Sequence, residues 1–214
     1  MKIGILGSGD VGRALGTGLA AIGHEIMIGS REPEPERLQT WMSAVGKRAS
    51  TGSTSDAAKF GEVIIVAVSW AGIENVLNGA RPGAAGKIVI DVTNPLEFKP
   101  GFGPTLAVGH DMSGGEIVQQ LLSDSSVVKT LNIINHAHMC QPKYTEGTPI
   151  MFYCGNNPSA KESVARLLES LGWEQTTDLG NITASRLLEP LCILWITYGM
   201  AHDNWDHAFG LLKA

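Results

Sequence analysis

A glycine-rich turn near the N-terminus limits the fold of this chain more than any other feature. The hexapeptide Gly7-Ser8-Gly9-Asp10-Val11-Gly12 directly follows the short apolar run Lys2–Leu6. The segment after it, Val11–Ile22, has apolar residues close to helical spacing, so the order is strand, turn, helix. In that context the pattern G-x-G-x-x-G predicts the first βαβ unit of a dinucleotide-binding fold.

Each glycine of this turn has its own role in the predicted fold. Gly7 permits the tight turn, Gly9 lets the backbone approach a pyrophosphate, and Gly12 lets the helix pack closely against the strand. The free N–H groups and the positive dipole end of the helix would then bind the phosphates. The alternative is a glycine-rich turn that binds no ligand.

Apolar runs and helical repeats alternate along the rest of the chain. Strands are expected at Glu25–Ile28, Val63–Val68, Lys87–Val92, Val127–Asn132, Ile150–Cys154 and Trp173–Thr177. Helices are expected at Glu34–Val45, from a cap at Ser53–Ser55 to Phe60, around Ile73–Leu77, and at Gly115–Leu122, Ala160–Leu171 and Ile182–Met200. Pro190 should kink the last helix or mark a restart.

The predicted strands show little polar alternation, which is typical of strands that are covered on both faces. The sequence therefore predicts an α/β fold of Rossmann type, with a doubly wound, mostly parallel sheet, extra C-terminal strands and a long C-terminal helix. We expect a single domain over residues 1–214, with a dinucleotide-binding core at 1–95 and a substrate-side extension at 96–214. The boundary between the two parts falls in the Gly- and Pro-rich segment Pro95–Gly109.

The end of the second strand indicates which dinucleotide is bound. An NAD site usually carries Asp or Glu about 20 residues beyond the glycines, where it binds the ribose 2′-hydroxyl. Here Ser30 stands 18 residues after Gly12 and is followed by Arg31. A hydroxyl and a guanidinium suit a 2′-phosphate, so the sequence favours NADP over NAD. The alternative is that Arg31 is a solvated loop residue.

Two further segments follow the ends of predicted strands. Val68-Ser69-Trp70 begins with the last residue of the third strand, and Thr93-Asn94-Pro95 directly follows the fourth. Because open α/β sheets bind ligands outside the carboxyl ends of their strands, we expect both segments to line the cofactor cleft. Thr93 and Asn94 could orient a nicotinamide ribose or a substrate carbonyl, although Asn-Pro is also a common turn sequence.

The segment His136-Ala137-His138-Met139-Cys140 contains the candidate catalytic residues. On a strand, His136 and His138 would share one face with Cys140 close by, as in a metal site, but the sequence nominates no further ligand and we predict no metal. Imidazole is the usual proton donor near neutral pH. We therefore interpret His136 and His138 as candidate proton donors beside the substrate.

The last predicted helix carries an apolar stripe made of Leu187, Leu191, Leu194 and Tyr198. Such a stripe belongs either to the core or to a subunit interface, and we expect a homodimer. On the same helix Arg186 and Glu189 are three residues apart, so they are predicted to pair.

Composition excludes several classes of partner. The net charge is −5 and no Lys/Arg cluster occurs, which argues against nucleic acid. No apolar run approaches the roughly 18 residues of a membrane span, so we expect a cytoplasmic protein with a small-molecule substrate or second cofactor. The three cysteines form no Cys-x-x-Cys pair, which suggests reduced thiols.

The sequence resembles the coenzyme F420-dependent NADP oxidoreductase family over essentially its whole length. The motifs that carry this resemblance are the early glycines, the Ser30-Arg31 pair, Asp91-Val92-Thr93-Asn94-Pro95, Val128-Lys129-Thr130-Leu131-Asn132 and Ser185-Arg186-Leu187-Leu188-Glu189-Pro190-Leu191. The resemblance implies that NADP lies along the first βα turn with its 2′-phosphate at Ser30 and Arg31. It also implies that Ile134, Asn135 and His136 lie near the nicotinamide, against which the deazaflavin stacks. A basic residue that often follows the Ser-Arg pair is absent here, and only Arg37 could take its place.

These observations predict an NADP-dependent oxidoreductase that transfers a hydride between NADP(H) and an acceptor stacked on the nicotinamide, namely coenzyme F420. Such a reaction requires alignment and exclusion of water more than acid or base groups. Two alternatives stay open. One is a reductase of another small acceptor, such as a flavin, a ferric chelate, a carbonyl or an imine. The other is a regulatory protein that binds NADPH without consuming it.

Overall fold

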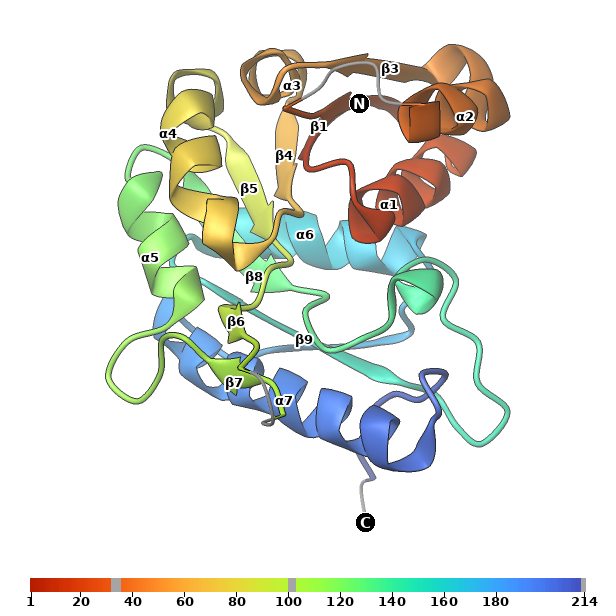
Figure 1. Ribbon diagram of the computed structural model, residues 1–214, viewed down its shortest axis with the longest axis vertical. Helices are drawn as coiled ribbons and strands as arrows, with labels where there is room; N and C mark the ends of the chain where they lie inside the picture. Colours follow the sequence, from red (N-terminus) through yellow and green to blue (C-terminus); the bar gives the residue numbers. More distant parts are fainter. Residues whose placement is uncertain (32–35, 100–102, 213–214) are drawn as a thin grey trace.

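The alternation of apolar strands and amphipathic helices produces an eight-stranded sheet in the computed structural model, which describes residues 1–31, 36–99 and 103–212. The strand order is β10-β9-β8-β5-β4-β1-β2-β3 (Figure 1). These strands are β1 (Lys2–Leu6), β2 (Glu25–Gly29), β3 (Ala49–Gly52), β4 (Val63–Val66), β5 (Ile88–Asp91), β8 (Ser126–Thr130), β9 (Ile150–Gly155) and β10 (Gln175–Asp178). β8 and β9 pair antiparallel, so β9 and β10 run opposite to the rest of a mostly parallel sheet.

Seven helices accompany the sheet in the described part of the chain. They are α1 (Asp10–Ala21), α2 (Glu36–Val45), α3 (Thr54–Phe60), α4 (Ile73–Ala84), α5 (Gly114–Leu121), α6 (Pro158–Ser170) and α7 (Ser185–His202). Four short 3-10 helices also occur: η1 (Gly46–Arg48), η2 (Trp70–Gly72), η3 (His136–His138) and η4 (Ile182–Ala184). Among the helices in residues 1–31, 36–99 and 103–212, none has the length and hydrophobicity of a membrane span.

The central strands are apolar on both faces because each face packs against helices. Along β4, Ile65 belongs to a buried cluster with α1, α2 and α6, whereas Ile64 and Val66 belong to a second cluster with α3, α4 and α5. Successive side chains of a strand point to opposite faces, so an unbroken apolar run is what a doubly covered strand requires. The predicted Rossmann-type α/β fold with a long C-terminal helix is confirmed.

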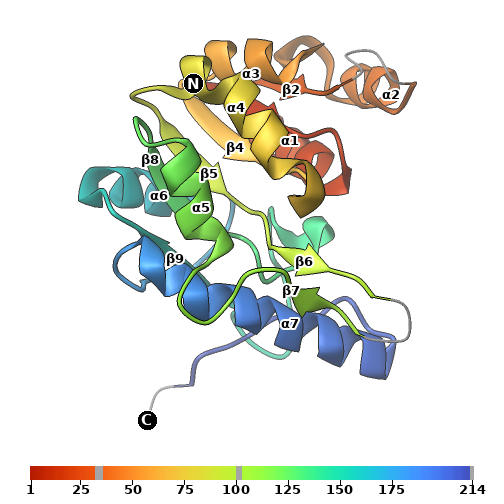
Figure 2. The ribbon, with the colours of Figure 1, turned by 60° about the vertical axis from the view of Figure 1, so that its left-hand side comes forward.

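The structure corrects the sequence prediction at several places. The edge strand β3 was not expected, nor was the small hairpin β6 (Leu96–Glu97) and β7 (Thr105–Leu106) within the predicted loop. β7 lies against α7, as Figures 1 and 2 show. The last helix is preceded by η4 and then runs through Pro190 without a restart. Ser53 caps α3 as predicted, in a capping box with Asp56.

Candidate functional site

The glycine-rich turn joins β1 to α1, and two of its glycines are required by the protein's own packing. Gly7 has a φ of 124°, and a Cβ there would lie 2.1 Å from the carbonyl oxygen of Ala67. A Cβ on Gly12 would lie 2.1 Å from the carbonyl oxygen of Gly7. At Gly9, in contrast, a Cβ would meet no atom within 4 Å. The protein itself therefore does not require glycine at position 9, and the space beside it is open to a ligand.

The start of α1 has the properties of a phosphate site. Gly9 is the N-cap and offers no side-chain hydrogen bond, so the first N–H groups of the helix have no capping side chain. Asp10 adds a negative charge to this turn, but Arg13 Nη2 lies 2.5 Å from its Oδ1 and compensates that charge. The Nη1 of Arg13 donates to the carbonyl oxygen of Ser8 at 2.7 Å, which stiffens the turn. Val11, the next residue of the motif, is half-buried against the core.

A polar cluster lies at the carboxyl ends of β1 and β2. The buried hydroxyls of Ser8 and Ser30 are 3.1 Å apart, and Arg37 Nη2 donates to Ser8 Oγ at 3.0 Å. Arg37 is exposed and comes from α2, while Arg31 is exposed at the end of β2. The structure thus brings Ser8, Ser30 and Arg37 together as hydroxyl and guanidinium donors, the chemistry that a 2′-phosphate requires.

Beyond the turn, the segments after β4 and β5 line up along the same sheet edge, because Val66 pairs with Asp91 in the parallel register. Val68 is half-buried beside Gly7, and Ser69 is exposed. Trp70 and Pro95 both lie against the start of α5, since a Cβ on Gly114 would lie 3.1 Å from Trp70 Cζ3 and 3.2 Å from Pro95 Cδ.

Thr93 and Asn94 are held firmly at the end of β5. The backbone N–H and the hydroxyl of Thr93 both donate to Asp91 Oδ1, at 2.9 and 2.7 Å. Asn94 and Asn132 exchange two hydrogen bonds: Asn94 Nδ2 donates to the Asn132 carbonyl oxygen at 2.8 Å, and Asn132 Nδ2 donates to Asn94 Oδ1 at 2.9 Å. These bonds tie the ends of β5 and β8 to each other.

A fully buried ion network beneath this edge was not predicted. Lys129 Nζ lies 2.8 Å from Asp91 Oδ2 and 3.1 Å from Glu189 Oε1. Burial alone would lower the pKa of Lys129, but the two carboxylates outweigh it and raise the pKa above its usual value. The available signal was a single lysine within the apolar run Val127–Leu131, because a buried charge requires a partner.

The predicted pair between Arg186 and Glu189 is wrong. Both oxygens of Glu189 accept hydrogen bonds from the backbone N–H groups of Gly114 and Gly115, at 2.9 Å each. Arg186 binds Glu116 instead, at 2.8 and 2.6 Å, and this hydrogen bonding lowers the pKa of the Glu116 carboxyl despite its burial. Tertiary partners on α5 and β8 therefore take both side chains, and spacing along one helix could not reveal them.

The loop after β8 connects the sheet edge to the C-terminal segment. Ile134 is buried, and Asn135 caps η3 through its Oδ1, which accepts from the Ala137 N–H at 3.0 Å. Asn135 Nδ2 also donates to the carbonyl oxygen of Trp205 at 3.3 Å. Asn135, one of the residues that the resemblance associates with the nicotinamide, thus contacts the C-terminal segment at Trp205.

The two candidate catalytic histidines lie on a 3-10 helix and not on a strand. His136 is exposed, whereas the Nε2 of His138 lies 2.9 Å from Asp206 Oδ1. Cys140 packs against α1, where a Cβ on Gly18 would lie 2.2 Å from its Sγ, and burial raises the pKa of its thiol to about 11. Across the described residues, no group of three or more His, Cys, Asp or Glu side chains is arranged to hold a metal ion.

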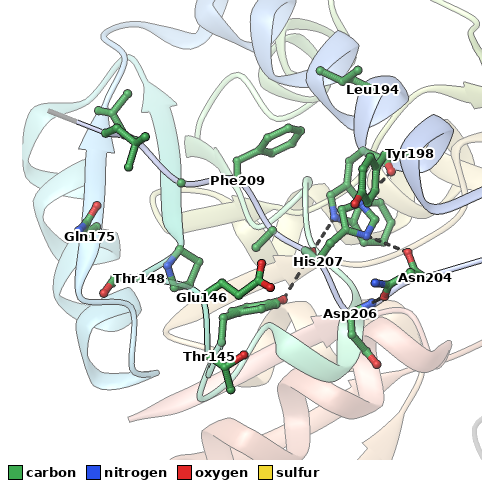
Figure 3. Close-up of a pocket in the computed structure, with 18 residues that line it drawn as sticks. Thr145, Glu146, Thr148, Gln175, Leu194, Tyr198, Asn204, Asp206, His207 and Phe209 are labelled. Atoms are coloured by element: carbon green, nitrogen blue, oxygen red, sulfur yellow. Dashed lines mark hydrogen bonds between the residues drawn. The ribbon is translucent and has the colours of Figure 1, made fainter. Parts of the chain in front are cut away.

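A pocket of about 750 Å³ lies next to this loop, between α7 and the C-terminal segment. Figure 3 shows the rings of Tyr198 and His207 in contact at its wall, with Glu146 and Phe209 nearby. None of the residues predicted for the cofactor or for catalysis lines it. Its connection to the site is through Asp206, which belongs to the lining and also binds His138.

Comparisons with known proteins give consistent results. The family profile described as NADP oxidoreductase coenzyme F420-dependent matches residues 2–95. The chain is 31% identical to the F420-dependent NADP reductase of Methanocaldococcus jannaschii over 213 residues, which cover 95% of each protein. A crystal structure from Arthrobacter sp. FB24, described as an F420-dependent NADP-reductase, superposes with a TM-score of 0.94 at 35% identity and full coverage of both chains.

A second group of relatives is longer. The chain is 30% identical over 190 residues to the metalloreductase STEAP3 of Rattus norvegicus, and this match covers 89% of the chain. The chain spans only 36% of the length of that metalloreductase.

Proposed function

The chain belongs to the coenzyme F420-dependent NADP oxidoreductase family, and from this premise we propose that it transfers a hydride between NADP(H) and coenzyme F420. Membership of the family supports NADP-dependent oxidoreduction as its class of activity. The observation that carries the choice of acceptor is the match to an F420-dependent NADP reductase over 95% of both chains. A shared dinucleotide-binding half alone would not favour one acceptor over another.

The residues of the site fit NADP. The open space at Gly9 and the uncapped start of α1 suit a pyrophosphate. The hydroxyls of Ser8 and Ser30 with the guanidinium of Arg37 suit a 2′-phosphate. When bound, the reduced nicotinamide supplies the hydride.

The protein's contribution at the other end of the cleft is rigid positioning. Thr93 is buried and Asn94 half-buried, and both are fixed by hydrogen bonds to Asp91 and Asn132. Trp70 adds a flat, half-buried ring on the same edge. Hydride transfer depends on alignment of two rings and exclusion of water, which such a wall promotes.

The proton-donor role of His136 and His138 is a separate part of the proposal. The reaction needs a donor only if the acceptor ring takes up a proton together with the hydride. Replacing each histidine with Gln should then lower turnover and change its dependence on pH, because a glutamine amide cannot donate the proton. Turnover that matches the wild type at every pH would exclude both residues from this role.

One observation favours a second acceptor. The match to a metalloreductase over 89% of this chain supports reduction of a flavin or a ferric chelate by the same NADPH site. The two candidates differ only in what is reduced, so one assay separates them.

The test is a fluorescence titration of the purified protein with NADPH and NADH, followed by addition of oxidised F420 to the NADPH complex. Loss of F420 absorbance in step with NADPH oxidation is the expected result. If NADPH binds tightly but F420 is not reduced, FAD and ferric citrate are tried next under the same conditions. Tight binding with no acceptor reduced would overturn the catalytic proposal and support the regulatory alternative.

A further inference from the structure

We propose that Lys129 is a positioning residue for this reaction, which holds the turn Thr93–Asn94 in the orientation that accepts the nicotinamide end of the cofactor. The inference rests on the proposed function, because it takes Thr93 and Asn94 as the wall of the nicotinamide site. Lys129 itself is fully buried and would touch neither the cofactor nor the acceptor.

The ammonium group of Lys129 has an oxygen acceptor for each of its three hydrogens, beneath the edge of the site. An ammonium has three hydrogens. Lys129 Nζ lies 2.8 Å from Asp91 Oδ2, 2.8 Å from the Thr93 carbonyl oxygen and 3.1 Å from Glu189 Oε1. One cation thus connects the end of β5 to α7 across the inside of the protein.

The two peptide groups that flank Thr93 are both held by this network. The N–H of Thr93 donates to Asp91 Oδ1 at 2.9 Å, and its carbonyl accepts from Lys129 at 2.8 Å. The Thr93 carbonyl belongs to the peptide group that joins Thr93 to Asn94, so the direction in which the Asn94 side chain leaves the backbone depends on the bond from Lys129. Asn94 then bonds to Asn132, which donates to the carbonyl oxygen of Leu188 on α7 at 3.0 Å.

The other arm of the network supports the wall formed by Trp70 and Pro95. Glu189 forms an ion pair with Lys129 and also accepts hydrogen bonds from the first two N–H groups of α5, those of Gly114 and Gly115. Both Trp70 and Pro95 lie against Gly114. The positive end of α5 and the ammonium together balance the two buried carboxylates.

The energetics of the network favour a positioning role over a purely stabilising one. Burying three charges carries a large desolvation cost, and well-packed apolar residues often stabilise a core as well or better. The hydrogen bonds of Lys129 converge on a turn at the ligand edge of the sheet, where orientation matters for hydride transfer. The two carboxylates raise the pKa of Lys129, so it stays a cation and exchanges no proton during turnover.

The test uses two ligands that differ at the nicotinamide end. NADPH reaches the Thr93–Asn94 wall, whereas 2′,5′-ADP carries the adenosine and 2′-phosphate but no nicotinamide. Lys129→Met alone would leave two buried carboxylates unpaired, so the main variant is the neutral triple Asp91→Asn, Lys129→Met, Glu189→Gln. Leu168→Ala in α6 is the control, because it removes a buried apolar side chain from an element that supplies no site residue.

The triple variant should bind 2′,5′-ADP within about twofold of wild type, because that end of the site shares no contact with the network. Its affinity for NADPH should fall about tenfold, which corresponds to about 1.4 kcal/mol. The fluorescence anisotropy of bound NADPH should also fall, because the nicotinamide is held less firmly. The fold decrease in kcat should be larger than the fold increase in KM for the acceptor. Leu168→Ala should lower the melting temperature and leave the ratio of the two affinities unchanged.

A folded triple variant with the wild-type affinity ratio and kcat would overturn the inference. If the triple variant does not fold, the double variant Asp91→Asn, Lys129→Met decides, since it removes the bond to the Thr93 carbonyl and leaves Glu189 on the N–H groups of Gly114 and Gly115. An unchanged ratio in that variant would equally overturn the inference. Failure of the proposed function would give a different result. The wild-type protein would then bind NADPH no better than 2′,5′-ADP, or it would reduce no acceptor. In the second case the ratio of the two affinities would still depend on Lys129.

Discussion

Substitution of Gly9 by Ala should weaken NADPH binding at the glycine-rich turn and leave the stability of the fold nearly unchanged. Gly9 has φ and ψ of −70° and −177°, which any residue adopts, and an added methyl group meets no atom within 4 Å. The free energy of unfolding should therefore change by less than about 1 kcal/mol. Alanine is a poorer N-cap than glycine, which destabilises the fold, but it also reduces the entropy of the unfolded chain, which stabilises the fold. The methyl group would enter the space assigned to the pyrophosphate. Loss of one or more charge-assisted bonds, each contributing about 1.5–3 kcal/mol, lowers NADPH affinity roughly tenfold to a hundredfold.

Two other glycines provide matched controls for this experiment. At Gly12 a methyl group would lie 2.1 Å from the Gly7 carbonyl oxygen, so Gly12→Ala should destabilise the fold by about 3 kcal/mol or more. Gly79 lies in α4 with no atom within 4 Å of an added Cβ, and Gly79→Ala should stabilise by about 1 kcal/mol without affecting NADPH. Thermal unfolding and NADPH titration are measured for all three. Wild-type NADPH affinity in a folded Gly9→Ala protein would refute the placement of the pyrophosphate.

Three more predictions concern other parts of the molecule. Ser30→Ala with Arg37→Ala should weaken NADPH binding about tenfold or more and leave NADH binding nearly unchanged, because only NADPH has a 2′-phosphate; equal losses in titrations of both would contradict the 2′-phosphate assignment. The side chain of Leu194 is 56% exposed on α7, and we propose that this face forms a homodimer. Light scattering should give a dimer for wild type and a monomer for Leu194→Glu, whereas a monomeric wild type would contradict it. The pKa of Glu116 is lowered in the folded protein by its pairing with Arg186. This pairing therefore stabilises the fold fully above the unfolded pKa of about 4.3, and the stabilisation is lost as the pH falls from there through the lower, folded pKa. The free energies of unfolding of wild type and Glu116→Gln, measured in urea, should therefore become equal in acid. A difference in stability that persists in acid would show that the ion pair is not the cause of the difference.

The parts of the fold that the sequence predicted correctly are those with a local cause. β1 was placed at Lys2–Leu6 because a short run containing Ile3, Ile5 and Leu6 ends at a glycine turn. The helix after Ser53 begins at a capping box whose two members are three residues apart. Where the cause is not local, prediction failed: β3 consists of Ala49–Gly52, which are small or polar, and it is a strand because it pairs with β2 along the edge of the sheet. Pairing of that kind depends on residues 23 positions away, and no pattern within the segment reveals it.

The same distinction explains which parts of the site were visible in the sequence. Ser30 could be assigned because a fixed spacing from the glycines brings the end of the second strand to the first turn. Lys129 and Glu189 could not, because their partners are set by packing: Lys129 meets Asp91, 38 residues earlier, and Glu189 meets Gly114, 75 residues earlier. A charged residue in an apolar run shows that a partner must exist but not which one. Candidate cofactor-binding residues can therefore be nominated from spacing, whereas the residues that fix the orientation of the Thr93–Asn94 turn emerge only when the helices are packed onto the sheet. In this protein the second group includes Lys129, and its removal should affect the nicotinamide end of the cofactor while the adenosine end still binds.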